Sequence, residues 1–151
     1  MNIQENLKPT GMVSISHFNS KGELLNQFEV PNLVVTTGKN YIASRIKDTT
    51  FAAMTHMAVG TSSTAASVTD TTLVAETGTR ATLSATTVST NTITYTATFA
   101  AGNATSTSPG IQEAGILNNS TGGTLLCRTV FPSVAKAAGD SIAITWVVTV
   151  S

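Results

Sequence analysis

Side chains that could perform nucleophilic or acid–base chemistry are scarce in this sequence. Its 151 residues include one cysteine, Cys127, and two histidines, His17 and His56. A catalytic triad needs a nucleophile, a histidine base and an orienting carboxylate within hydrogen-bond reach of one another. We expect His17 at the end of a strand and His56 inside another, and the sequence has no nucleophile elbow of the form G-x-S-x-G. The sequence therefore predicts a protein that is not an enzyme.

Four carboxylates could form the pair that glycoside hydrolysis requires: Asp70, Glu76, Glu113 and Asp140. Asp70 and Asp140 stand in turn contexts, where an aspartate ordinarily accepts backbone hydrogen bonds. Glu76 precedes Arg80 by four residues, which favours an ion pair. We therefore expect structural roles for these side chains.

Ligands for a metal or a cofactor also lack the necessary spacing. A zinc site takes three or four ligands, and no pair of histidines or cysteines here has ligand spacing. The glycines at 102, 110, 115, 122 and 123 are typical of turns, and no strand-to-helix phosphate loop surrounds them. The sequence predicts no metal and no cofactor. Cys127 lies in an apolar run and is expected to be a small buried hydrophobe.

The balance of charge bears on the possible partners. Charged residues make up 11% of the chain, and eight basic residues offset eight acidic ones without forming a run. Nucleic acid is excluded as a partner because its binding needs a basic patch. A membrane span is not expected because no segment approaches about twenty apolar residues. Little self-repulsion and few charges to protect strand edges predict self-association, as a dimer or trimer.

The elements that must position these residues are mostly strands. From residue 54 onward apolar residues recur with period two, and in segment 92–99 every odd position is apolar while every even one is Thr. We expect hairpins at 13–30, at 79–99 and at 111–131, and a last strand at 141–150 that is buried on both faces or central in its sheet. Trp146 in this last strand is expected in the core.

One helix is predicted over residues 39–47, capped by Thr36 or Thr37, with Tyr41, Ile42 and Ile46 on its apolar face. Together with about eight strands it indicates an all-β fold, an antiparallel β-sandwich of jelly-roll type. Residues 12–151 form this single domain.

The first eleven residues, 1–11, are polar and follow neither the helical nor the strand period, so we expect an extended N-terminal arm. Ile3 and Leu7 are its candidate apolar anchors for a partner, and Pro9 is expected to limit the pairing of the arm with its own sheet. The arm has no basic region followed by an apolar stretch, so no secretion signal is expected.

The order of short segments from residue 32 to the C-terminus resembles a class of small virion proteins of tailed bacteriophages. The segments that carry the resemblance are NLVVTTGKN (32–40), MAVGTSSTA (57–65), TDTTL (69–73) with Glu76 and Arg80, QEAGIL (112–117), GTLLCRTVF (123–131) and GDSI (139–142). The resemblance implies a β-sandwich component of a phage particle, assembled in the cytoplasm of the bacterial host.

Two assignments follow from this resemblance, and a third class stays open. The first is a capsid decoration (cement) protein that binds the major capsid protein across neighbouring subunits, with the arm reaching an adjacent one. We favour it because the chain has none of the repeats that give fibres their length. The second is a tail-fibre or baseplate domain that binds a receptor. The third class is a small carbohydrate-binding module, which an exposed aromatic cluster would support.

Overall fold

The computed structural model describes residues 1, 3–47 and 51–151. Within these residues the chain forms ten strands and one helix. Their order is β1 Pro9–Phe18, β2 Leu24–Pro31, β3 Leu33–Val34, α1 Thr36–Lys47, β4 His56–Gly60, β5 Glu76–Thr82, β6 Ala85–Ser89, β7 Thr92–Phe99, β8 Ser106–Leu117, β9 Leu125–Lys136 and β10 Ser141–Val150.

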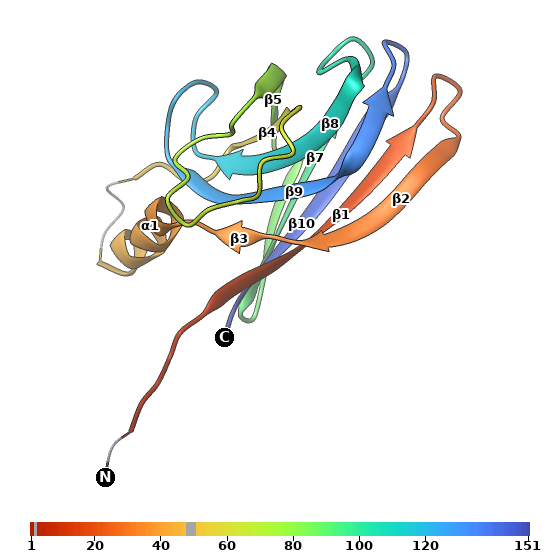
Figure 1. Ribbon diagram of the computed structural model, residues 1–151. Coiled ribbons are helices and arrows are strands. Elements are labelled where there is room, and N and C mark those ends of the chain that lie inside the picture. The colour runs from red at the N-terminus through yellow and green to blue at the C-terminus, as the bar shows by residue number, and fades with distance from the viewer. Residues whose placement is uncertain (2, 48–50) are drawn as a thin grey trace.

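The strands form two antiparallel sheets that pack face to face (Figure 1). One sheet has the order β2-β1-β10-β7-β6 and the other the order β3-β9-β8-β4-β5. The predicted antiparallel β-sandwich with a single short helix is therefore confirmed. The first and last long strands, β1 and β10, are neighbours, so both ends of the chain leave the same side of the molecule.

The core lies between the sheets, where alternate side chains of each strand point inward. On β7 the side chains of Tyr95, Ala97 and Phe99 are buried while Thr98 is exposed, as the period of two predicts. On β10 the buried residues include Trp146, whose position in the core is confirmed. β10 is central in its sheet, between β1 and β7, which decides between the two predicted positions.

Segment 79–88 departs from the prediction because it divides between the sheets. Its first part belongs to β5, which pairs with β4, and only β6 pairs with β7 as the expected hairpin partner. The backbone changes sheet at Leu83 and Ser84, where Leu83 N–H donates to the carbonyl of Thr55, just before β4, and Ser84 N–H donates to the carbonyl of Thr96 in β7. Alternation along a strand cannot reveal such a crossing, because both sheets have the same period.

The N-terminal arm is shorter than the predicted 1–11, because β1 begins at Pro9. Pro9 lies opposite Val150, and the preceding residue, Lys8, exchanges backbone hydrogen bonds with Ser151 at 2.6 and 3.2 Å. In an antiparallel pair hydrogen-bonded positions alternate with non-bonded ones, so Pro9 takes a position that needs no N–H donor. Pro9 therefore does not interrupt the sheet.

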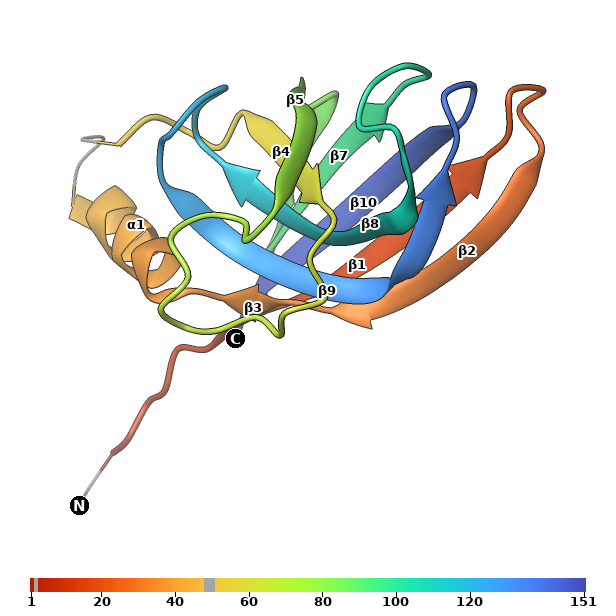
Figure 2. The ribbon, with the colours of Figure 1, turned by 45° about the horizontal axis from the view of Figure 1, so that its top comes forward.

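We call residues 1–7 the arm. It runs as an extended segment away from both sheets (Figures 1 and 2). Asn2 lies outside the described residues.

The segment 61–75, which we call the cover loop, lies over the outer face of the sheet that contains β9 and β8 (Figure 2). Its Leu73 packs in a second apolar cluster with Val35, Ala58, Leu117 and Leu125. Thr36, at the start of α1, donates a backbone hydrogen bond of 2.8 Å to Val68 of the loop. The part of this sheet beneath the loop is therefore covered on both faces.

The helix α1 closes one end of the sandwich and begins three residues earlier than predicted. Gly38, in its first turn, is buried against β9: a Cβ built on Gly38 would lie 1.9 Å from the carbonyl oxygen of Leu126. Any other residue at 38 would push the helix away from β9.

The substitution Gly38→Ala tests this contact, because the contact and helix propensity predict changes of opposite sign in the free energy of unfolding. Helix propensity alone predicts that alanine raises stability by about 0.5–1 kcal/mol. The contact with Leu126 instead predicts a loss of about 1–3 kcal/mol, because a well-packed site must shift to admit the methyl group. Urea denaturation measures the difference, with the exposed Asn40→Ala in the same helix as control. A gain in stability for Gly38→Ala would contradict the packing of α1 on β9.

Candidate functional site

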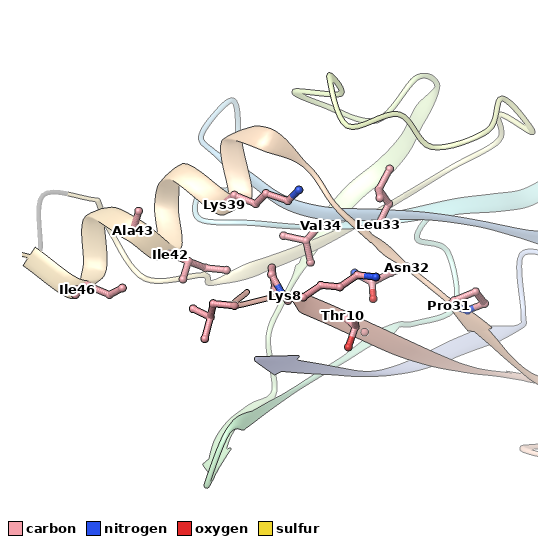
Figure 3. A pocket seen from close by; sticks show the side chains of 13 residues that line it. Lys8, Thr10, Pro31, Asn32, Leu33, Val34, Lys39, Ile42, Ala43 and Ile46 are labelled. Carbon is pink, nitrogen blue, oxygen red and sulfur yellow. The ribbon is translucent and has the colours of Figure 1, made fainter. Parts of the chain in front are cut away.

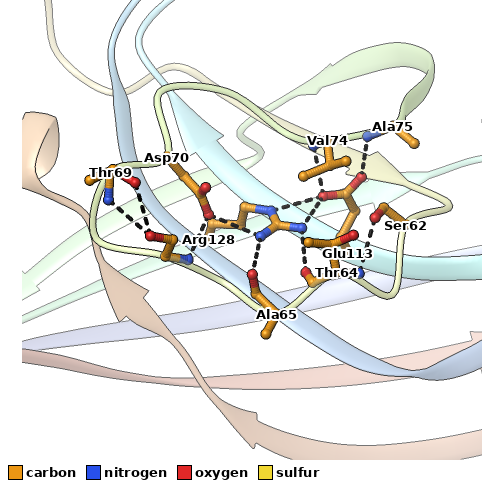
Figure 4. A network of polar contacts seen from close by, with 10 residues as sticks. Ser62, Thr64, Ala65, Thr69, Asp70, Val74, Ala75, Glu113 and Arg128 are labelled. Atoms are coloured by element: carbon orange, nitrogen blue, oxygen red, sulfur yellow. Dashed lines mark hydrogen bonds and ion pairs between the residues drawn. The ribbon is translucent and has the colours of Figure 1, made fainter.

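A buried arginine, Arg128 of β9, organises the largest polar network (Figure 4). Its Nε donates to Glu113 Oε2 at 2.9 Å, and Nη2 lies 2.8 Å from the same oxygen. Nη1 donates to Asp70 Oδ2 at 2.9 Å and to the carbonyl of Ala65 at 3.3 Å, while Nη2 donates to the carbonyl of Thr64 at 2.8 Å. These contacts use the whole donor capacity of the guanidinium.

The carboxylates of this network also hold the backbone of the cover loop. Glu113, fully buried on β8, accepts hydrogen bonds from the N–H of Val74 at 3.1 Å and of Ala75 at 2.7 Å. Asp70 accepts from the N–H of Ser67 at 2.8 Å, as predicted for an aspartate in a turn. The network thus attaches both halves of the loop to one guanidinium.

The structure brings together two of the four candidate carboxylates, Asp70 and Glu113, but an arginine stands between them. Each carboxylate forms an ion pair with Arg128 and accepts hydrogen bonds from backbone N–H groups of residues 67–75. This arrangement fits a structural staple between the loop and the sheet.

A second polar pair lies at the other end of the core. His17 Nε2 is 2.8 Å from Asp140 Oδ2, and Asp140 also accepts from the N–H of Ala137 at 2.9 Å. These two hydrogen bonds, the one with His17 first, hold the pKa of Asp140 below its ordinary value. The other ring nitrogen of His17 lies 3.5 Å from Asn26 Nδ2, so both ring nitrogens face partners other than a nucleophile.

The remaining candidate residues take the predicted structural places. Glu76 and Arg80 form an ion pair with Arg80 Nε 2.7 Å from Glu76 Oε1. Cys127 is free and fully buried, and burial raises the pKa of its thiol well above the usual range. His56 contacts only its neighbour Thr55 among the hydrogen bonds of the described residues, at 2.8 Å.

Among the residues that the structure describes, no group of three or more His, Cys, Asp or Glu side chains could hold a metal ion. Over the same part of the chain, no helix has the length and hydropathy to cross a bilayer.

An apolar groove runs beside α1, and its two hollows share Ile42 and Ile46 of the helix. The first, of about 560 Å³, lies between α1, residues 7–11 at the base of the arm and the start of β1, and residues 31–34 (Figure 3). The second, of about 370 Å³, lies between α1 and the ends of β6, β7 and β10, with Val88 and Ile93 in its lining. We call the two hollows together the α1 groove.

The groove exposes apolar surface that the helical period predicts to be buried. Ile46, expected on the core face of the helix, is 78% exposed, and Val88 of β6 is 70% exposed. The charged residues in the lining are Lys8, Lys39 and Arg45, all basic. The site that the described residues offer is therefore an apolar binding surface with a basic rim.

The predicted partner residues divide between the free arm and the sheet. Ile3 and Leu7 are 81% and 67% exposed, and Leu7 also lines the first hollow, whereas Pro9 is half-buried in β1. The groove could not be predicted from the sequence, because no local sequence pattern indicates how much of the end of a sheet a helix will cover. The role of Arg128 was not predicted either, although an arginine inside the apolar run 125–131 is a signal of a buried charge that needs partners.

Comparisons with protein-family models, with curated proteins and with solved structures gave no match to this chain.

Arg128→Met tests whether the network is a structural staple. Removal of the guanidinium leaves Glu113 buried without its counter-charge, so we expect a loss of about 3–5 kcal/mol in the free energy of unfolding. Because the partners act together, Arg128→Met combined with Glu113→Leu should cost less than the two single changes added. Urea denaturation measures all three, with exposed Lys21→Met as control within about 0.5 kcal/mol. Additive losses would contradict the coupling.

The pair of His17 and Asp140 predicts a dependence of stability on pH. The pKa of Asp140 is lowered in the folded chain, so its contribution to stability is complete above the ordinary aspartate pKa of about 4 and is lost as the pH falls through the folded-state value. Asp140→Asn should therefore reduce stability at pH 7, and the difference from the unchanged chain should shrink below pH 4. Chemical denaturation from pH 2.5 to 7 measures it, and a difference that stays constant over this range would refute the assignment.

Proposed function

We propose that this chain is a structural subunit of a tailed-phage virion, a capsid decoration protein that binds neighbouring subunits of the capsid and stabilises the head. The observation that carries the proposal is the arm, in which Ile3 and Leu7 are 81% and 67% exposed on a segment that leaves the domain. Apolar side chains that stay exposed to water contribute no hydrophobic free energy to folding. Their burial on a partner would contribute about 1.5–3 kcal/mol of binding free energy each.

The rest of the chain suits an assembly role. The chain has a net charge of zero, which weakens repulsion between neighbouring copies on a crowded surface. A docked domain and a docked arm on one chain add their affinities through effective concentration, so two modest contacts can hold a particle together.

The two alternatives differ in how far the described residues favour them. A carbohydrate-binding module would present a platform of exposed aromatic side chains. Here Trp146 is in the core, and among the described residues Phe51 is the only aromatic one of the exposed large hydrophobic side chains. A tail-fibre or baseplate domain would share the fold and the arm, so an experiment must separate it from a decoration protein.

The test is to add purified protein to phage heads that lack it and to measure binding by co-sedimentation. Deletion of residues 1–7 should weaken binding at least tenfold, since two apolar anchors are lost. The double change Ile3→Asp and Leu7→Asp should do the same. Its matched control, Gln4→Asp with Asn6→Asp, adds the same charges to the opposite side of the extended arm and should bind normally.

Two results would count against the proposal. Full binding by the truncated chain would remove the arm from the function. If the intact chain never binds heads while particles without it fail to adsorb to cells, the tail-fibre or baseplate assignment is correct.

A further inference from the structure

The α1 groove and the arm are two complementary surfaces on one chain. The groove is lined by apolar side chains with a basic rim of Lys39 and Arg45. The arm carries apolar Ile3 and Leu7 on either side of one acidic residue, Glu5. In an extended segment alternate residues point the same way, so Ile3, Glu5 and Leu7 share one face about 13 Å long.

We propose that the arm of one chain lies in the α1 groove of a second copy of this chain. Ile3, the outer anchor of the arm, would cover Ile42 and Ile46, and Glu5 would face the basic rim. This inference rests on the proposed assembly role and names the neighbour that receives the arm.

The direction of the arm favours a second copy over its own groove. Lys8 is fixed by its two backbone hydrogen bonds to Ser151, so beyond Leu7 the arm continues the line of β1 and runs away from α1 (Figures 1 and 2). Leu7, at the base of the arm, lines the first hollow of its own groove. For Ile3 to enter the same groove, the chain would have to reverse within residues 4–6, a stretch without glycine or proline. Outward, seven residues span at most about 25 Å, enough to reach a neighbouring domain.

Charge and exposure favour another copy over a partner of different sequence. The basic rim of the groove finds its opposite charge in Glu5, the single acidic residue of segment 1–7. The number of arms also equals the number of grooves, because each copy supplies one apolar arm and one groove, in which Ile46 is 78% exposed. Exchange among copies therefore covers every arm and every groove.

The test mixes two purified full-length variants, Ile3→Cys and Ile46→Cys, at micromolar concentration under mild oxidation. A disulfide between them can form only between chains, and the native Cys127 is fully buried. We expect the mixed dimer to form at least tenfold faster than with the control partner Leu24→Cys. Leu24 is half-exposed at the start of β2, by the β1–β2 hairpin and away from the groove.

A charge change on the arm gives a second readout. Glu5→Lys in the Ile3→Cys chain should slow the cross-link several-fold because it places a positive charge against Lys39 and Arg45. Gln4→Lys, on the opposite side of the arm, should leave the rate unchanged. Equal rates for the Ile46→Cys and Leu24→Cys partners would overturn the proposal, and so would equal effects of the two lysine changes.

Three further outcomes test this inference and separate it from the proposed function. If the chain carrying both Ile3→Cys and Ile46→Cys forms mainly an intrachain disulfide at all concentrations, the arm occupies its own groove and the exchange is wrong. On heads, a cross-link from Ile3→Cys to the capsid protein instead of to Ile46→Cys overturns the exchange and leaves the decoration role intact. Cross-linking between copies without any binding to heads overturns the decoration role and leaves the exchange intact.

Discussion

The buried guanidinium of Arg128 is the interaction on which the arrangement of the outer face depends. A charge that is removed from water must have its hydrogen bonds satisfied within the protein, and here the partners are Glu113, Asp70 and two carbonyls of the cover loop. Because these partners come from a strand and from a loop, the loop must lie across the sheet for the charge to be buried. Leu73 then closes an apolar cluster over the same face.

The cover loop also influences where α1 lies and therefore which apolar surface stays exposed beside the helix. The cover loop holds the start of α1 through Val68, and Gly38 lets the helix approach the backbone of β9. The first turn of the helix is therefore fixed, while its later turns extend past the sheet that anchors it. Ile42 and Ile46 lie over the ends of the opposite sheet and line a groove together with Leu7 at the base of the arm.

The arm and the groove give the chain a surface chemistry suited to assembly. Both expose apolar side chains, and the charges beside them are of opposite sign, acidic on the arm and basic on the rim. Elsewhere the titratable residues hold the fold together: Asp140 pairs with His17, and Asp70 and Glu113 pair with Arg128. The carboxylates of Asp70, Glu113 and Asp140 are thus committed to contacts that hold the fold.

The sequence by itself determined the strand class and the local pairings. Alternation in 92–99, turn residues between 118 and 124, and the polar start of the chain predicted β7, the hairpin of β8 and β9, and the existence of an arm, because these depend on residues close in the chain. Only the tertiary structure decided which sheet receives each half of segment 79–88, that Pro9 fits a non-bonded position of β1, and that Ile46 is exposed. It also decided that Arg128 meets Asp70, 58 residues away, since such contacts depend on how whole sheets and loops pack and leave no periodic signal along the chain.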